Sequence, residues 1–234
     1  MRAPIVMNSI RSLLHRCALC CVVLLGTIAA AQLRAADLTS DGARLSRFLD
    51  ATHVEERWPA GVHVSWETGI PDSKPEKAEG RHTHCSTFVA SAAKQLGIYI
   101  LRPPEHGQAL LANAQYDWLA DAGAAHGWRA LVTGAQAQET ANRGELVVAT
   151  YRNHSDSKPG HVAIVRPSSK SMREIETEGP QITQAGGTNY LSTTLKRGFA
   201  GHPAAWNNGE VRYYAHAIDW PHWPGHGRNH PVQP

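Results

Sequence analysis

The stretch Arg81–Gly97, RHTHCSTFVASAAKQLG, predicts an amphipathic helix with a cysteine in its first turn. Gly97 is a natural stop for this helix, and Thr83 or His84 is expected near its N-cap. Apolar side chains recur at helical spacing and predict one buried stripe: Cys85, Phe88, Val89, Ala92 and Leu96. Polar side chains fall on the other side of the helix: Thr87, Ser91, Lys94 and Gln95.

Cys85 has two interpretations. In the first turn it would meet the free N–H groups and the positive end of the helix dipole, which favour a thiolate and can stabilise an oxyanion. It could instead be a small core cysteine on the apolar face. The other cysteines, Cys17, Cys20 and Cys21, lie in an N-terminal apolar run, and loss of that run would leave one thiol. Because an unpaired thiol is a liability in an oxidising compartment, Cys85 is either inert or kept for its chemistry.

Residues 1–35 are typical of an export signal. Arginines precede an apolar run, Cys17–Ala31, that is too short for a comfortable membrane span, and small residues follow it. Cleavage after Ala31 or Ala35 predicts a periplasmic or secreted protein with no stable membrane insertion. An uncleaved anchor is the alternative.

The export signal also distorts the net charge. The whole chain has a formal charge of +3, but residues 1–35 hold four arginines and no acid. The other 199 residues have 19 basic and 20 acidic side chains, a formal charge of −1. No clustered basic face suggests nucleic-acid binding. The length suits one domain, expected over residues 36–219 and as a monomer, with a flexible Pro-, Gly- and His-rich tail over 220–234.

The remaining pattern predicts an α+β fold, in which one or two early helices precede a run of strands that form an antiparallel sheet. Helices are expected behind the Thr39–Asp41 cap, at Ala109–Ala120 and, as a short one, at Tyr190–Arg197. The buried face of the second would hold Leu110, Ala114, Trp118 and Leu119. The expected strands are Gly61–Trp66, Glu145–Tyr151, His161–Val165, Arg173–Thr177, Gln181–Gln184 and Glu210–Asp219. Residues 123–141 are expected to be irregular.

A catalytic cysteine needs a base and a third polar group that orients the base. His161 opens a strand directly after a Pro-Gly turn, which would fix its imidazole at the end of a sheet, on the face that packs on the Cys85 helix. Its other interpretation is a half-exposed strand histidine with no role. Gln184, near the end of the next strand, is the candidate for the third group. Its competitors are Glu178, Gln181 and Asn189.

The order and spacing of these segments resemble the NlpC-type cell-wall cysteine peptidases and the related CHAP amidases, which have a papain-like fold. The family's motifs are an Asp-Cys-Ser-Gly-Phe-Val helix start, a closing Gly-Ile, a Leu-Pro-Arg loop leading to glutamine, a Gly-Asp-Leu-Val strand, a His-Val-Gly-Ile strand and a third group often followed by alanine. Their counterparts here, between about residues 80 and 190, are His84–Val89, Gly97–Ile98, Leu101–Gln108, Gly144–Val147, His161–Ile164 and Gln184–Ala185.

The resemblance implies hydrolysis of peptidoglycan amide bonds, in stem peptides or at N-acetylmuramoyl-L-alanine, without a cofactor. It implies that Cys85 is the nucleophile, His161 the base and Gln184 the orienting group. Two departures lie beside the expected substrate cleft and leave the cleaved bond open. His84 replaces the acid before the cysteine, and Thr87 replaces the glycine two residues after it.

The expected mechanism is acyl transfer. The Cys85 thiolate attacks an amide carbonyl, backbone N–H groups around Cys85 and Ser86 bind the oxyanion, and His161 protonates the leaving amine. Water then releases the acyl-enzyme. The candidates for contact with the substrate are His84, Trp66, Tyr116 and Trp118.

Three alternatives stay open. The protein could be a secreted binding domain that keeps the fold without activity, or an exported protease or toxin that acts on proteins. A metal site is the third, formed by His82, His84 and Cys85 or by the tail histidines His222, His226 and His230. His-x-His-Cys is not a standard zinc spacing, and a tail broken by prolines cannot hold helical ligand geometry, so no metal is expected.

Overall fold

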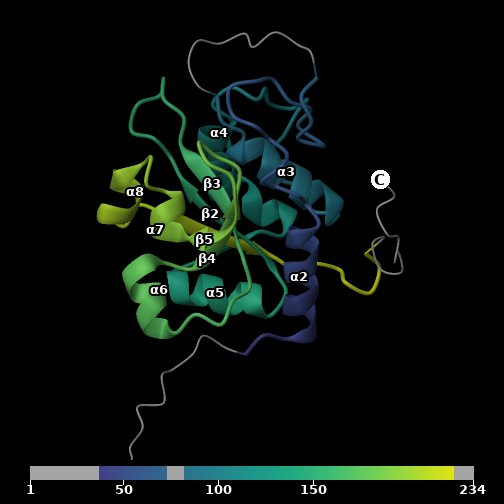
Figure 1. Cartoon of the computed structure of the whole chain (residues 1–234), viewed down its shortest axis with the longest axis vertical. Coiled ribbons are helices and arrows are strands. Elements are labelled where there is room, and N and C mark those ends of the chain that lie inside the picture. The colour runs from purple at the N-terminus through teal and green to yellow at the C-terminus, as the bar shows by residue number, and fades with distance from the viewer. Residues whose placement is uncertain (1–36, 73–81, 224–234) are drawn as a thin grey trace, which may run out of the picture. The chain divides into compact units, whose positions relative to one another are not determined.

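The computed structural model describes residues 37–72 and 82–223 (Figure 1). The predicted export signal and its cleavage points lie outside the described residues. The described chain has an α+β fold with a six-stranded antiparallel sheet in the order β1-β6-β2-β3-β4-β5. The strands are β1 (Arg129–Leu131), β2 (Leu146–Tyr151), β3 (His161–Val165), β4 (Gln181–Gln184), β5 (Tyr190–Thr194) and β6 (Arg212–His216). The expected α+β class is therefore confirmed.

Helices cover both faces of this sheet because its central strands are apolar on both sides. Every residue of β2 and β3 is buried. One core contains Val148, Val162 and Ile164 together with side chains of α2, α3 and α4, whereas Ala163 and Val165 belong to a second core with α5, α7 and α8. The helices are α2 (Ser40–Asp50), α3 (Cys85–Gln95), α4 (Leu111–Asp121), α5 (Gly134–Asn142), α6 (Met172–Glu178), α7 (Leu195–Gly198) and α8 (Pro203–Asn207), with a 3₁₀ turn η1 (Gly123–His126).

Helix α3 lies where the sequence predicts it, with His84 at the N-cap and Gly97, at φ 75°, just past its end. Its expected polar side is wrong at two positions, since Thr87 and Ser91 are both buried. Each hydroxyl is satisfied by a backbone carbonyl, that of Thr87 by the carbonyl of His84 at 3.0 Å. The helix is thus covered all round except at its last turn, and it packs on β3.

Two predictions of secondary structure before β2 are wrong: an expected strand is a loop, and an expected irregular segment contains helices and a strand. Gly61–Trp66 is not a strand, because only Val64 makes an isolated bridge, to Pro71. Residues 123–141 are not irregular, since they contain η1, β1 and most of α5. The Thr133 side chain caps α5 by accepting from the backbone N–H of Gln136.

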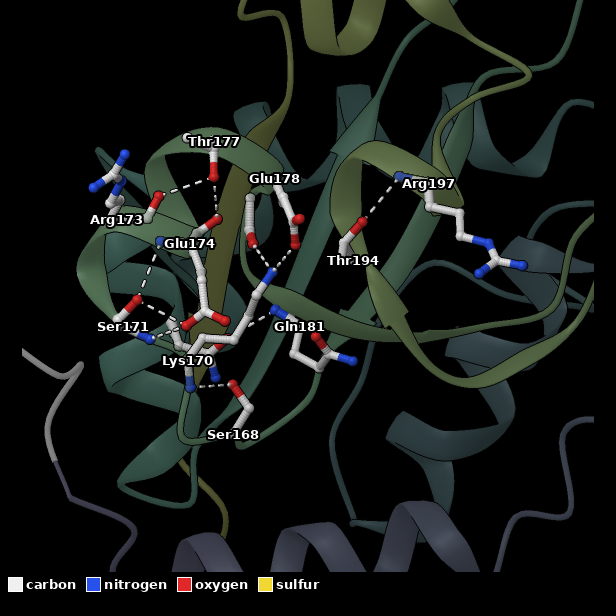
Figure 2. Close-up of polar contacts among 12 residues, drawn as sticks. Ser168, Lys170, Ser171, Arg173, Glu174, Thr177, Glu178, Gln181, Thr194 and Arg197 are labelled. Atoms are coloured by element: carbon white, nitrogen blue, oxygen red, sulfur yellow. Dashed lines mark hydrogen bonds and ion pairs between the residues drawn. The ribbon is translucent and has the colours of Figure 1, made fainter.

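Two predictions near the C-terminal half of the sheet are also wrong. The segment expected as the strand Arg173–Thr177 is helix α6, which begins with a capping box between Ser171 and Glu174 (Figure 2). The segment expected as the helix Tyr190–Arg197 is strand β5 followed by the single turn α7. Because β5 is a strand, β4 pairs with β3 on one edge and with β5 on the other.

Helix α4 exists as predicted, but its buried face is shifted. Leu110 is 39% exposed and sits before the helix at φ 54°. Ala114 and Trp118 are only half-buried. The buried residues are Leu111, Ala112, Asn113, Gln115 and Leu119. Two of these are polar: Asn113 bonds backbone groups of the loop after β2, and Gln115 donates to the backbone carbonyls of Ser86 in α3 and of Leu101.

The predicted flexible tail is anchored at its start. Trp220 is buried and its indole N–H donates to the Gly144 carbonyl at 2.8 Å. Trp223 donates to the Gln95 carbonyl at 2.9 Å and packs against the core. The folded region therefore extends past residue 219 to at least Trp223, and residues 224–234 lie outside the described residues.

Candidate active site

The Cys85 thiol lies inside the protein, at the start of α3. The residue is 3% exposed, and burial raises the pKa of the thiol above its ordinary value. Polar neighbours act in the opposite direction on that pKa: the backbone N–H groups of Val162, Ser86 and Cys85, and the Thr83 hydroxyl. Because Val162 directly follows His161, the sulfur lies next to the backbone at the start of β3.

His161 is held by Gln184. The imidazole Nε2 lies 2.8 Å from the amide Oε1 of Gln184, and both residues are at most 4% exposed. The pairing of β3 with β4 explains the contact: continuing the register of Ile164 with Thr183 puts Gln184 opposite Ala163, one diagonal step from His161 on the same face. Each side chain can therefore reach the other without distortion of either strand.

A second hydrogen bond decides which end of the Gln184 amide faces His161. The amide nitrogen donates to the Thr188 carbonyl at 3.2 Å, which leaves the oxygen to accept from His161. Nε2 of His161 then carries the proton, and Nδ1 is the ring nitrogen with a free lone pair. Gln184 thus sets the tautomer that a base needs for a proton donor at Nδ1.

The face of β3 that carries His161 is not the one predicted. Val162 and Ile164 pack with α3, whereas Ala163 and Val165 face α7 and α8. Because neighbouring strand residues alternate, His161 points to the α7–α8 side. Its ring meets the Phe199 ring edge-on at 4.6 Å and stacks on the His202 ring at 5.5 Å and 20°. The sulfur is therefore near the His161 backbone, on the other side of the strand's end.

Both members of the candidate pair are neutral at rest. Burial lowers the pKa of His161, and the hydrogen bond that its Nε2–H donates to Gln184 only partly opposes this. The pKa of Cys85 is raised. Within the described part of the chain, no hydrogen bond joins the thiol to the His161 ring. The geometry therefore favours proton transfer during attack over a preformed thiolate–imidazolium pair.

A cleft of about 440 Å³ opens beside His161 and Gln184. Thr83, whose hydroxyl neighbours the sulfur, is part of its wall. None of the side chains that line the cleft is acidic: Thr83, His161, Gln184, Gly187, Thr188, Tyr190, Arg197, Gly198, Ala200, Gly201 and His202. Its volume lies in the range typical of small-molecule and peptide sites.

The three competitors for the third group are engaged elsewhere. Figure 2 shows Glu178 in an ion pair with Lys170, at 3.3 Å. The Gln181 amide donates to the Ser192 hydroxyl. Asn189 ties the β4–β5 turn to loop carbonyls that follow α2. Of the four candidates, Gln184 is the one that contacts His161.

Ser86 and His84 lie beside the sulfur in the chain but outside the cleft wall. Ser86 is buried, and its backbone N–H is among the groups that lower the pKa of Cys85. The His84 ring is also buried, and its Nε2 lies 2.9 Å from the Val62 carbonyl. His84 therefore holds the 61–66 segment against α3, a structural role in place of the expected substrate contact.

The structure does not bring Trp66, Tyr116 or Trp118 to the cleft. Trp66 lies under the side chains of Lys94 and Arg102, and Trp118 packs on Tyr99 and His126. Tyr116 lines a separate hollow of about 230 Å³ with Arg152, Asn153, His154 and Glu210. The two aromatic residues of α4, Tyr116 and Trp118, are only half-buried, and neither lines the cleft.

Residues 197–202 form the far wall of the cleft, and the sequence alone identifies none of them as part of the site. His202 is the clearest omission, since burial and the neighbouring His161 lower the pKa of its ring to about 4. Its place before a proline, Pro203, marks a helix start, but nothing local indicates that α8 packs beside β3. Only the tertiary structure brings this histidine to the site.

A scan against known protein families finds no match to this sequence, and no curated protein matches it. In the described ranges no helix is long and apolar enough to cross a membrane. Within residues 37–72 and 82–223, no group of three or more His, Cys, Asp or Glu side chains is arranged to hold a metal ion.

Proposed function

We propose that this protein is an exported cysteine hydrolase of papain-like architecture that cleaves amide bonds of peptidoglycan, in stem peptides or at N-acetylmuramoyl-L-alanine. One observation supports the proposal above the others. His161 is fixed through Nε2 by Gln184 at 2.8 Å, and the next backbone N–H along β3 meets the Cys85 sulfur at the start of α3. These contacts bring a candidate nucleophile from α3, a candidate base from β3 and a candidate orienting amide from β4 to the start of β3, which supports the proposal.

The reaction begins with a neutral pair. As the sulfur bonds to the amide carbon, the thiol proton passes to Nδ1 of His161, and Gln184 stabilises the resulting imidazolium through Nε2. Backbone N–H groups of Cys85 and Ser86, which the helix itself does not use, donate hydrogen bonds to the oxyanion. His161 then gives its proton to the leaving amine, and a thioester remains.

Water completes the cycle. His161, again neutral, takes a proton from a water molecule that attacks the thioester carbon, and the thiol leaves with that proton. The net reaction adds one water to the amide bond and gives one carboxylic acid and one amine. The export signal predicted for residues 1–35 would bring this activity to the compartment that holds peptidoglycan.

A catalytically inactive binding domain is the second candidate, and a specific observation favours it. Cys85 is 3% exposed, and its thiol has no hydrogen bond to the His161 ring among the described residues. In that case substrate fragments would bind the cleft without being cleaved.

Mass spectrometry of purified peptidoglycan separates the two candidates. Incubation with the mature protein should release fragments that each gain one water, and Cys85→Ala should abolish them because no nucleophile remains. The Cys85→Ala protein must keep its thermal unfolding midpoint, which shows that its fold is intact. Identical fragment patterns from the wild type and Cys85→Ala would refute the hydrolase and leave the binding domain.

A further inference from the structure

We propose that Arg197 binds a carboxylate of the substrate at the mouth of the cleft, so that the protein selects anionic peptides over neutral ones. This inference rests on the proposed function and adds the chemical class of the substrate. It starts from the charges of the cleft wall. Arg197 is the one full cation among the lining residues, and no lining residue is an acid.

The two imidazoles of the wall do not offset or add to this charge. The pKa values of both His161 and His202 are lowered, the second to about 4, so both rings are neutral near pH 7. The lining residues of the cleft therefore carry one full charge, that of the Arg197 guanidinium. A cleft lined by one sign of charge raises the local concentration of the opposite ion.

The contacts that orient Arg197 do not use the N–H donors of its guanidinium. Its backbone N–H closes the α7 turn on the Thr194 hydroxyl at 3.2 Å. The guanidinium lies over the Tyr190 ring at 5.0 Å, and Tyr190 belongs to the same cleft wall. Figure 2 shows the side chain extending away from the α7 cap, where the backbone N–H of Arg197 meets Thr194.

Arg197 differs from two other arginines of the described chain, each of which pairs with a carboxylate. Arg152 pairs with Asp117 and Asp156, and Arg166 pairs with Asp50. In contrast to these two, Arg197 forms no ion pair among the described residues. Its fork of N–H donors fits both oxygens of a carboxylate at once. An aromatic support that orients a guanidinium and leaves its donors open is suited to an incoming anion.

The occupant follows from the neighbours of Arg197 in the cleft. His161 and Gln184 line the same cleft, so an anion at Arg197 belongs to the molecule whose amide is near the base. A peptide with a free carboxylate close to the cleaved bond meets this requirement. A detached phosphate or sulfate ion does not present an amide to the base.

Binding to a protein that cannot turn over its ligand tests the inference separately from catalysis. The probes are a soluble muropeptide with free carboxylates and the same muropeptide with those groups converted to carboxamides. The Cys85→Ala protein should bind the acid form about fivefold more tightly, the upper ratio expected of an exposed ion pair. Added salt should reduce this ratio, because exposed charges are screened.

Two further variants locate the preference. Arg197→Gln, added to Cys85→Ala, should bring the ratio close to one. Lys196→Gln is the matched control, since it removes the neighbouring cation, which lies over the Trp206 ring and does not line the cleft. That variant should keep the fivefold ratio.

Equal binding of the acid and amide forms would overturn the inference, as would a ratio that Arg197→Gln leaves unchanged. Failure of both probes to bind at millimolar concentration would overturn it as well. These outcomes are independent of the hydrolase proposal. Wild-type cleavage of both probes at equal rates would leave that proposal intact, and a preserved binding preference without cleavage would refute only the hydrolase.

Discussion

Gly198 sets the position of the Gln184 amide, and replacing it by alanine should disturb His161 without touching it. A Cβ built at residue 198 would lie 2.6 Å from Gln184 Oε1 and 2.5 Å from the Cδ1 atom of Ile182. The end of Ile182 can rotate away. The amide oxygen is held by His161 on one side and, through the rest of the amide, by the Thr188 carbonyl.

The size of the effect follows from these distances. An ordinary contact needs at least 3.4 Å, so the Gln184 oxygen must retreat by about 0.8 Å. If that movement follows the hydrogen bond, its 2.8 Å length grows to about 3.6 Å, where no hydrogen bond remains. A buried N–H without a partner costs about 1–3 kcal/mol, which corresponds to about 5- to 150-fold in kcat/KM. Overpacking adds about 1–3 kcal/mol of lost stability.

Two measurements check this. Initial rates of muropeptide hydrolysis give kcat/KM, and nitrogen-15 NMR follows the Nε2–H proton of His161, which should lose its hydrogen-bonded shift in Gly198→Ala. Gly201→Ala is the control, because Gly201 lines the same cleft and a Cβ there meets nothing within 4 Å. An unchanged Nε2–H signal in Gly198→Ala would refute the reasoning, whatever the rates.

The titration of the two histidines gives two more predictions. Gln184→Glu puts a carboxylate on Nε2 of His161 and raises the pKa of its ring by about one unit or more; the acidic limb of the pH profile of kcat/KM should therefore move to higher pH, and a limb that stays or falls would contradict this. The pKa of His202 is about 4 in the fold against 6.5 ordinarily, so the unfolded chain takes up a proton first and stability is lost as pH falls from 6.5 towards 4. His202→Phe, which keeps an aromatic ring on His161, should lose less melting temperature between pH 7 and pH 4.5 than the wild type, and an equal loss would show that His202 does not contribute.

The central part of the site could be predicted because it depends on strand alternation and on the order of segments. β2 and β3 are apolar runs bounded by turn residues, and their extent was readable within a residue. The contact of His161 with Gln184 requires only that β3 and β4 pair antiparallel, and they do so although helix α6 lies between them in the chain. The face of His161 was not readable, because a strand buried on both sides has no polar face to mark its orientation.

The far wall could not be predicted because its elements are too short to carry a pattern. α7 has four residues and α8 has five, so neither shows a helical period. α6 is different, since Ser171 and Glu174 form a readable capping box. The polar–apolar alternation of Arg173–Thr177 also fits a strand. The segment is a helix because the capping box starts one and only Ile175 has to be buried, which a short helix can do.

The surroundings of the sulfur bear on whether Cys85 is inert. A cysteine that only fills space would be surrounded by apolar atoms, and its pKa would rise without opposition. Here four polar groups oppose the effect of burial: the N–H groups of Val162, Ser86 and Cys85, and the Thr83 hydroxyl. Each is a donor that gains strength when negative charge develops on the sulfur. Burial protects a neutral thiol from oxidants, and in the proposed reaction the same donors would lower the cost of charge on the sulfur when an amide enters from the Thr83 wall of the cleft.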